Sequence, residues 1–562
     1  KVSSRPLVTA MKQSAVLGVA GLASPVPILS RVGAPDVVFR GGLVIDGSGA
    51  PGREVDVAVT GDSITAVGRV TDSGLQEIDL GGRVLAPGFI DIHSHADLNL
   101  LIEPRAESRI RQGVTLEVVG QDGSSILWTR EAAEERDRRW REAYGVAIDF
   151  HDLGGFLDRL ERTPVAVNVA SMVGHGTLRG HVVGADDRPA SDVEIQAMEE
   201  HLRTGLRQGA VGFSSGLEYT PGSFAPLEEL VALAGVLRGT GYPYASHMRN
   251  EDDRLLSAVE ETLHVGRMAE VPVQVSHLKA QGRRNYWKAE VALRMIEAAR
   301  EDGLDVHFDR YPYVAYATGL SNLFPSWSRA GGTDAFFRRL DDPEAAGRIE
   351  AFARAKVDLL GSWDAVQVTS TLEGTAWARG RRLGELARER GEEPYALAVD
   401  LMRRNRGSVG MIGFGMSEEN TERILAHPLG MICSDGGAYA PYGPLGSGSP
   451  HPRGYGTFPR LLGLYVREAR ALTLEQAVHK ITGLPAAKLR LPDRGRIRVG
   501  GKADLVAFDP DTVSDGATFE APHAYPTGID HVMVNGTLTI RAGAQTGEVA
   551  GRPVRGQGHR SN

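Results

Sequence analysis

The segment Ala86-Pro87-Gly88-Phe89-Ile90-Asp91-Ile92-His93-Ser94-His95 combines an apolar run with two closely spaced histidines. The apolar residues that follow Pro87-Gly88 predict a buried β-strand. Side chains at positions i and i+2 of a strand project from the same face, so both imidazoles can reach one point. Imidazole is a common ligand of divalent zinc. The segment therefore predicts a strand that ends in a metal site.

Strand-like and helix-like stretches alternate along the chain from this segment to Asp435. Predicted strands cover 114–119, 165–173, 211–215, 244–247, 273–277, 306–309 and 431–435, and predicted helices cover 192–209, 227–239, 255–269 and 288–302. Regular alternation predicts a parallel α/β fold, and a (β/α)8 barrel of the TIM type suits the length. In such barrels, functional side chains lie where the strands end.

Short β-rich segments flank this alternating region on both sides. Near the N-terminus, Val37–Arg40 and Leu43–Asp46 predict one hairpin across Gly41-Gly42, and 56–59 with 64–68 predict a second. The same pattern returns at 503–509 and 531–536. We expect 35–85 and 490–548 to form one small β domain beside a barrel over 86–489. The charged, helix-prone residues 331–420 predict an insertion or lid, and 549–562 a tail.

Composition excludes several classes of protein. The 562 residues carry 63 basic and 71 acidic side chains, a net charge of −8, with no concentrated basic stripe, which argues against a nucleic-acid partner. Cys433 is the single cysteine, so an internal disulfide and a multi-cysteine zinc site are excluded. No run reaches the roughly 18–20 apolar residues of a transmembrane helix, so stable membrane insertion is not expected.

Residues 1–34 differ from the rest and predict a leader. Arg5 and Lys12 precede a mildly apolar run, the layout of a twin-arginine-like export signal, but Arg5 is followed by Pro6. A cytoplasmic location is slightly favoured over export.

Potential metal ligands stand at five predicted strand ends, which a barrel would bring to one edge. They are His93 with His95, Asp122, His247, His277 and Asp435. Imidazole and carboxylate ligands suit Zn²⁺, which would lower the pKa of a bound water. A carboxylate must then accept the proton of the water and pass it to the leaving nitrogen, and we assign this role to Asp435. The alternative for Asp435 is a structural role in the turn Ser434-Asp435-Gly436-Gly437.

Seven motifs stand out between Asp36 and Gly543: residues 87–95, Met172–Arg179, Ser246–Glu251, Val275–Lys279, Asp309–Tyr313, Ser434–Gly436, and His451–Arg453 with Gly456–Arg460. Through these motifs the chain resembles the amidohydrolase superfamily and, within it, the N-acyl-D-amino-acid deacylases. The resemblance implies a distorted barrel and a small β-sandwich formed by both chain ends. It implies one or two zinc ions and a small-molecule substrate, and it leaves the oligomeric state open.

The resemblance also implies a role for each matching residue. His247 and His277 would hold the tightly bound zinc, His93 and His95 would form a weaker second site, and Asp435 would be the catalytic base. The residues that would contact substrate are Lys279, Tyr311 and Arg453, which grip its α-carboxylate, and His175 and Arg249, which line the pocket.

The chain departs from the family pattern at two places. Asp122 lies in the turn Gly120-Gln121-Asp122-Gly123, where the deacylases carry a metal-binding cysteine. A carboxylate there removes the soft ligand and would admit Mn²⁺ or Co²⁺, whereas an Asx turn without a metal role is the alternative. Ala317 stands where the family offers a substrate-binding hydroxyl, for which Thr318 or Tyr316 would substitute.

The predicted activity is metal-dependent hydrolysis of a linear amide, an N-acyl-D-amino acid, to a D-amino acid and a carboxylate. A D-amino-acid-releasing dipeptidase and a hydantoinase-like cyclic amidase are the enzyme alternatives. The non-enzyme alternative is a metal-storing or ligand-binding barrel, which would turn over no amide.

Overall fold

The computed structural model of the protein describes residues 33–558. The predicted leader lies outside this range except for residues 33 and 34, as do the last four residues of the predicted tail. Within residues 33–558, none of the helices combines the length and the apolar character that crossing a bilayer requires.

Eight parallel strands form the predicted barrel when β8 and β9 are counted as one strand interrupted at Met172. In barrel order they are β6 (Phe89–Asp91), β7 (Val114–Val119), β8 (Asn168–Ser171) with β9 (Val173–Gly174), β10 (Phe213–Gly216), β11 (Tyr244–His247), β12 (Val273–Val275), β13 (Val306–Arg310) and β17 (Gly430–Ile432). Each neighbouring pair is parallel. The ring closes beyond the last strand, where the Asp435 amide donates to the His93 carbonyl at 2.9 Å. The predicted fold class is confirmed.

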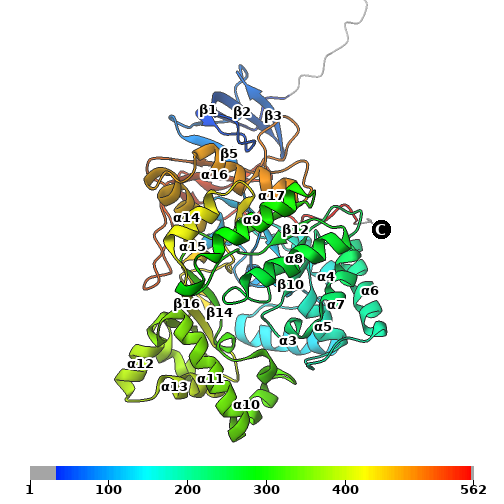
Figure 1. Ribbon diagram of the computed structural model, residues 1–562. Helices are drawn as coiled ribbons and strands as arrows, with labels where there is room; N and C mark the ends of the chain where they lie inside the picture. Colours follow the sequence, from blue (N-terminus) through cyan, green and yellow to red (C-terminus); the bar gives the residue numbers. More distant parts are fainter. Residues whose placement is uncertain (1–32, 559–562) are drawn as a thin grey trace, which may run out of the picture. The chain divides into compact units, whose positions relative to one another are not determined.

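Helices follow the strands and cover the outside of the barrel (Figure 1). They are α1 (Asn99–Ile102), α2 (Glu107–Ile110), α3 (Arg130–Tyr144), α4 (Leu153–Arg162), α5 (His175–Val182), α6 (Asp192–Gln208), α7 (Leu227–Gly235), α8 (Leu255–Ala269), α9 (Lys288–Glu301), α14 (Glu418–Ala426), α15 (Arg453–Arg460), α16 (Leu474–Ile481) and α17 (Gly483–Lys488). Local sequence sets their ends: Ser191 and Glu194 form a capping box at the start of α6, and Gly209 ends it with a left-handed backbone.

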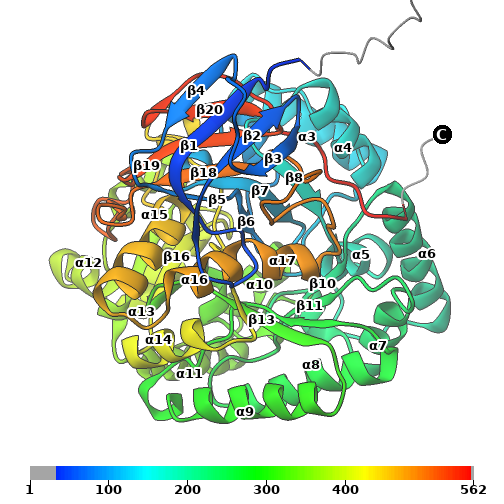
Figure 2. The ribbon, with the colours of Figure 1, turned by 90° about the horizontal axis from the view of Figure 1, so that it is seen from above.

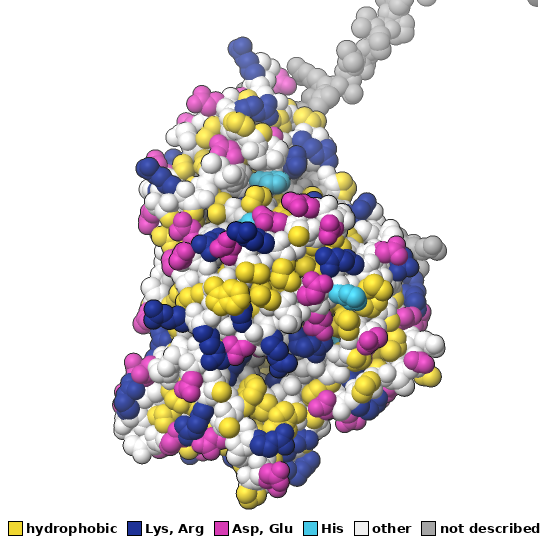
Figure 3. Space-filling view, viewed as in Figure 1, with side chains coloured by type: hydrophobic (Ala, Val, Ile, Leu, Met, Phe, Trp, Pro, Cys, Tyr) yellow, Lys and Arg dark blue, Asp and Glu magenta, His cyan; other side chains and the backbone are white. Residues whose placement is uncertain are grey.

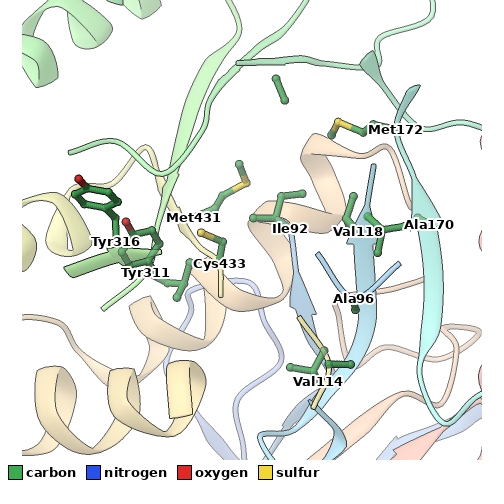
Figure 4. Close-up of a cluster of buried hydrophobic side chains, with 14 of the residues drawn as sticks. Ile92, Ala96, Val114, Val118, Ala170, Met172, Tyr311, Tyr316, Met431 and Cys433 are labelled. Atoms are coloured by element: carbon green, nitrogen blue, oxygen red, sulfur yellow. The ribbon is translucent and has the colours of Figure 1, made fainter. Parts of the chain in front are cut away.

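The barrel interior is filled by apolar side chains from strands far apart in the sequence. Figure 4 shows Val118 of β7, Ala170 of β8 and Met431 of β17 in one buried cluster with Cys433. All four side chains are fully buried. The interior is therefore a packed core, which leaves the ends of the strands as the place for chemistry.

Both ends of the chain pair into one sheet, as predicted. The nine-stranded sheet has the order β21-β20-β19-β18-β5-β1-β2-β3, with β4 paired to β1. Its strands are β1 (Val37–Val44), β2 (Arg53–Thr60), β3 (Ser63–Gly68), β4 (Gln76–Asp79), β5 (Val84–Pro87), β18 (Leu505–Phe508), β19 (Ile529–Val534), β20 (Thr537–Arg541) and β21 (Ala544–Gln545). The two halves meet where β18 runs antiparallel to β5, which is visible from above in Figure 2.

The predicted hairpin over Val37–Asp46 is wrong. Residues 37–44 form the single strand β1, and both of its halves pair with β2. Gly41 adopts a φ of +66°, and the register shifts between Phe39 and Gly42, so the glycine pair produces a bulge instead of a turn. The second predicted hairpin is confirmed, because β2 and β3 are antiparallel across Gly61-Asp62.

The segment Ala86–His95 is not one strand. β5 ends at Pro87 in the nine-stranded sheet, and β6 begins at Phe89 in the barrel. Gly88 lies at the crossing, where its amide donates to the Asp504 carbonyl at 2.8 Å. His93 and His95 follow β6 and are not part of it. The alternation of side chains along a strand therefore does not explain how both imidazoles reach one site.

Replacing Gly88 by Ala should destabilise the protein by about 1–3 kcal/mol. A Cβ atom at this position would lie 2.1 Å from Oγ1 of Thr115, and neither backbone can move without disturbing a sheet. Thermal unfolding followed by circular dichroism measures the effect. Gly235→Ala is the control, since a Cβ there meets nothing within 4 Å, and a Gly88→Ala protein as stable as this control would contradict the packing argument.

The chain leaves the barrel after β13 and returns at β17. Between them lie the antiparallel sheet β14 (Ala315–Gly319), β16 (Gly410–Phe414) and β15 (Val366–Ser370), and helices α10 (Thr333–Asp341), α11 (Pro343–Leu360), α12 (Leu383–Arg390) and α13 (Pro394–Arg404). Figure 1 shows these helices gathered beside β14 and β16. The sheet begins at Ala315, before the predicted insertion over 331–420, because β14 pairs with β16. The predicted domain boundaries stay predictions.

The described part of the predicted tail packs on the barrel. The Val554 amide donates to the Val169 carbonyl of β8 at 2.7 Å, and the Val169 amide donates to the Arg552 carbonyl at 3.1 Å.

On the molecular face drawn in Figure 3, basic and acidic side chains are interspersed.

Candidate active site

The predicted metal ligands converge at the carboxyl ends of the barrel strands. His247 is the last residue of β11, and the others follow β6, β7, β12 and β17. Asp122 lies at the centre of the group. Its Oδ1 is 3.3 Å from Nε2 of His93, and its Oδ2 lies 3.4 Å from Nε2 of His95 and of His277 and 3.5 Å from Nδ1 of His247. The five strand ends thus meet at one point.

Asp435 borders the same group. Its Oδ1 lies 3.1 Å from Nε2 of His95 and 3.6 Å from Nε2 of His93, and its Oδ2 accepts a hydrogen bond from Arg453 at 2.7 Å. Burial acts to raise the pKa of Asp435, but the Arg453 guanidinium and neighbouring histidines lower it by more, so the pKa lies well below its usual range. Asp435 is therefore an ionised carboxylate that can accept a proton.

Three of these residues have a left-handed backbone. The φ angles are +52° at Asp122, +34° at His277 and +50° at Asp435. Residues other than glycine rarely adopt this conformation, which costs of order 1–3 kcal/mol where it is sparsely populated. The strain coincides with the turns that aim these side chains into the barrel mouth.

The side chains fit a divalent metal ion. Nε2 of His93 and Oδ1 of Asp122 are buried without a hydrogen-bond partner among the described residues. Nδ1 of His247 and Nε2 of His277 face each other at 2.9 Å. Converging imidazole nitrogens and carboxylate oxygens form the ligand set that zinc and similar metals prefer.

Three of the histidines turn their other ring nitrogen toward a second carboxylate. His93 Nδ1 lies 3.4 Å from Asp309, His247 Nε2 lies 3.4 Å from Glu218, and His277 Nδ1 lies 3.0 Å from Glu251. A carboxylate at this position fixes the ring orientation and the tautomer of a metal-ligating histidine. This arrangement is a second reason to read the cluster as a metal centre.

A cavity of about 270 Å³ opens onto the cluster. All three residues predicted to grip the substrate carboxylate line it, as do Tyr316, Ala317 and Thr318 of β14. The hydroxyls of Tyr311 and Tyr316 are buried and have no hydrogen-bond partner within residues 33–558, so both are available to a ligand. Thr318 donates to the Tyr219 hydroxyl at 3.2 Å.

The two cavity-lining cations are paired with carboxylates. Lys279 Nζ donates to Glu251 at 2.5 Å and lies 2.7 Å from Nδ1 of His277. Arg453 pairs with Asp435 and lies over the Tyr311 ring at 4.8 Å. A substrate carboxylate would therefore join existing ion pairs at both positions.

Arg249 and His175 do not line this cavity, which contradicts their predicted place. Arg249 donates to Glu261 with two nitrogens, at 2.9 to 3.1 Å, and to the carbonyls of Ser223 and Ala225. His175 is fully buried, and its Nε2 lies 2.9 Å from Glu229. Both side chains are paired with carboxylates of neighbouring helices, Glu261 of α8 and Glu229 of α7.

The sequence analysis missed the carboxylates Glu218, Glu251 and Asp309. Glu251 and Asp309 stand inside motifs quoted above, and Glu218 comes two residues after β10. The strand-end rule applied to β10 would have found Glu218.

The whole-chain comparisons agree with this geometry. Residues 76–540 match the amidohydrolase family. The chain belongs to this family. Among its relatives, a D-aminoacylase from Alcaligenes xylosoxydans xylosoxydans is 38% identical over 519 residues, which cover 92% of this amidohydrolase and 97% of the relative. An N-acyl-D-glutamate deacylase from the same organism is 38% identical over 505 residues, which cover 89% of this amidohydrolase and 93% of the relative.

A solved structure extends the likeness to three dimensions. The N-acyl-D-glutamate deacylase from Bordetella bronchiseptica, complexed with zinc and a phosphonate mimic of the tetrahedral intermediate, matches with a TM-score of 0.78. The two chains are 34% identical, and the match covers 93% of this amidohydrolase and 100% of the other chain. This amidohydrolase therefore belongs with the N-acyl-D-amino-acid deacylases.

Proposed function

We propose that this amidohydrolase hydrolyses N-acyl-D-amino acids to a D-amino acid and a carboxylate in a metal-dependent reaction. The observation that carries the proposal is the meeting of four histidines, Asp122 and Asp435 at the mouth of a barrel shared with D-aminoacylase and the N-acyl-D-glutamate deacylases.

The metal would be held by His93, His95, Asp122, His247 and His277. When bound, a divalent ion supplies Lewis acidity, which lowers the pKa of a water and polarises a carbonyl oxygen. Asp122 replaces the soft cysteine ligand of the family with a hard oxygen, which suits Mn²⁺ and Co²⁺ as well as Zn²⁺.

Asp435 would move the proton of the reaction. Its ionised carboxylate borders the metal cluster, so it is placed to accept a proton from the attacking water. The water oxygen would form a bond to the acyl carbon, and the protonated carboxyl would then donate its proton to the nitrogen as the C–N bond breaks, so that the nitrogen leaves as an amine. A carboxylate on the other side of the cleaved bond is the second product.

Lys279, Tyr311 and Arg453 would bind the α-carboxylate of the substrate. Two cations and an unpartnered hydroxyl line one cavity, and charge-assisted hydrogen bonds are the strong ones in proteins. Fixing the carboxylate fixes the position of the scissile amide relative to Asp435. A linear substrate with a free carboxylate uses all three groups, whereas a cyclic amide does not.

Replacing Arg453 by Ala should raise KM for an N-acetyl-D-amino acid by about 10- to 100-fold, because a hydrogen bond to a charged group is worth about 1.5–3 kcal/mol. Arg453 also pairs with Asp435, so a loss of kcat is expected as well. Steady-state kinetics on an acid and on its carboxamide analogue separate the two effects. An equal loss on both substrates would show that Arg453 acts on Asp435 alone.

Metal analysis and a substrate panel on the same preparation test the proposed function. The panel contains N-acetyl-D- and N-acetyl-L-amino acids, a D-amino-acid dipeptide and a hydantoin, and the apoprotein is reconstituted with Zn²⁺, Mn²⁺ or Co²⁺. We expect turnover of the D-acids that is lost with a chelator. Faster hydrolysis of the dipeptide or hydantoin would assign the alternative substrate class, and no turnover by metal-replete protein would refute an amidase.

A further inference from the structure

One buried lysine of helix α11, Lys356, contacts a carboxylate that borders the metal cluster. Lys356 is near the end of this helix, within the predicted insertion, and only 8% of its side chain is exposed. Its Nζ lies 3.3 Å from Oε1 of Glu218 and 2.7 Å from Oδ2 of Asp252. Burial lowers the pKa of Lys356, but the two carboxylates raise it by more, so the ammonium stays charged.

Glu218 connects this lysine to a predicted metal ligand. Its Oε2 lies 3.4 Å from Nε2 of His247, whose Nδ1 faces Asp122 and His277. Two further side chains from the segment between β13 and β17 contact the same residue: Asn322 donates to the Glu218 carboxylate and Arg329 to its carbonyl, both at 3.3 Å. The segment outside the barrel thus holds Glu218 from three positions.

We propose that Lys356 is a positioning residue of the metal centre, which acts on His247 through Glu218. The Glu218 carboxylate holds the His247 ring with Nδ1 aimed at the cluster. Lys356 holds that carboxylate in place, because a buried carboxylate without a cation would turn toward another donor. The insertion therefore contributes to metal affinity.

This inference rests on the proposed metal site but not on the proposed substrate. Its test measures the dissociation constant for Zn²⁺ of the full chain by competition with a chelating dye. Loss of a carboxylate partner of a ligating histidine typically costs 10- to 100-fold in metal affinity. We expect Lys356→Met and Glu218→Gln to weaken zinc binding by this factor, and Lys356→Arg, which keeps the charge, to restore part of it.

Arg354→Met is the matched control. Arg354 lies on the same helix and pairs with Glu350 and Glu393 at 2.6 and 3.0 Å, but these carboxylates do not contact the cluster. We expect the parent zinc affinity for this variant. In the Glu218→Gln background, Lys356→Met should change the zinc affinity by less than about threefold. The reason is that the Glu218 carboxylate, through which Lys356 acts on His247, is already absent.

Two outcomes would overturn this inference and leave the proposed function intact. One is an unchanged zinc affinity in Lys356→Met, whatever its melting temperature, and the other is a full additional loss in the double variant. If Lys356→Met does not fold, an unchanged affinity in the isosteric Glu218→Gln variant overturns it equally. A parent chain that binds no divalent ion would instead overturn the proposed function, and this inference with it.

Discussion

Replacing Asp435 by Asn is expected to lower kcat by about 10²- to 10⁴-fold, the range for loss of a general acid–base group. The amide keeps the size of the side chain and one acceptor oxygen, but it cannot accept the proton of the water. The Arg453 ion pair keeps the carboxylate ionised in the parent although burial opposes this, so the variant loses the proton acceptor. Steady-state hydrolysis of an N-acetyl-D-amino acid measures the loss.

Zinc content and the melting temperature must be measured on the same Asp435→Asn preparation. Asp435 also lies within the group that could hold a metal, so a fall in zinc content parallel to kcat would make it a ligand instead of the base. Asp305→Asn is the control. Asp305 precedes β13 at the opposite end of the barrel, with half of its side chain exposed, and its replacement should leave kcat unchanged. Full activity in Asp435→Asn would refute the proton-transfer role.

Replacing Arg109 by Met is expected to destabilise the protein by about 3–5 kcal/mol, the cost of removing one partner from a buried ion pair. Arg109 is fully buried below the metal cluster. Its guanidinium lies 3.0 Å from Asp91 of β6 and 2.9 Å from Glu117 of β7, and it donates to the Gly436 carbonyl at 2.8 Å. One side chain thus ties the first two strands to the loop that carries Asp435.

The destabilisation of Arg109→Met should increase with pH. Burial raises the pKa of Glu117 to about 7 in the parent, although Arg109 lowers it, so loss of Arg109 raises it further. A carboxyl whose pKa is higher in the folded than in the unfolded state binds more protons when folded, and stability then falls as pH rises through that range. Melting temperatures at pH 6 and pH 8 should therefore differ more in Arg109→Met than in the parent.

Two further variants complete this experiment. Arg109→Met with Glu117→Gln should recover part of the stability, because it removes one of the unpaired carboxylates. Arg111→Met, two residues away and partly exposed, should shift the melting temperature little. A melting temperature of Arg109→Met equal to that of Arg111→Met at both pH values would contradict the stabilising role assigned to the buried Arg109 ion pairs.

Local sequence was sufficient for the elements that repeat a short-range pattern. β11 and α8 have the predicted bounds, since buried runs and helical periodicity depend on neighbouring residues only. One predicted turn failed where distant pairing decided the backbone: the glycine pair in β1 forms a bulge because both halves of the strand pair with β2. The strand predicted after Pro87-Gly88 is β6, but it ends at Asp91, before the two histidines.

The candidate ligands could be predicted because each one lies at the end of a predicted strand. A parallel barrel places every strand end at one face, so a histidine or aspartate at a predicted strand end is a candidate whatever its partners. Arg249 and His175 were placed wrongly because each lies in a quoted motif, yet the carboxylates that pair with them come from α8 and α7. Their orientation depends on how these helices pack, which the motifs do not encode.

The sequence alone was sufficient to predict a parallel α/β barrel, one β domain built from both chain ends, and candidate metal ligands at five strand ends. Tertiary structure alone decided which ring nitrogen faces Asp122, which carboxylate supports each histidine, and that Lys356 of α11 reaches Glu218. The physical reason is the distance along the sequence over which the interactions act. Strand and helix formation depend on side chains a few residues apart. The orientation of a buried charge depends on every partner that folding brings within a few ångströms.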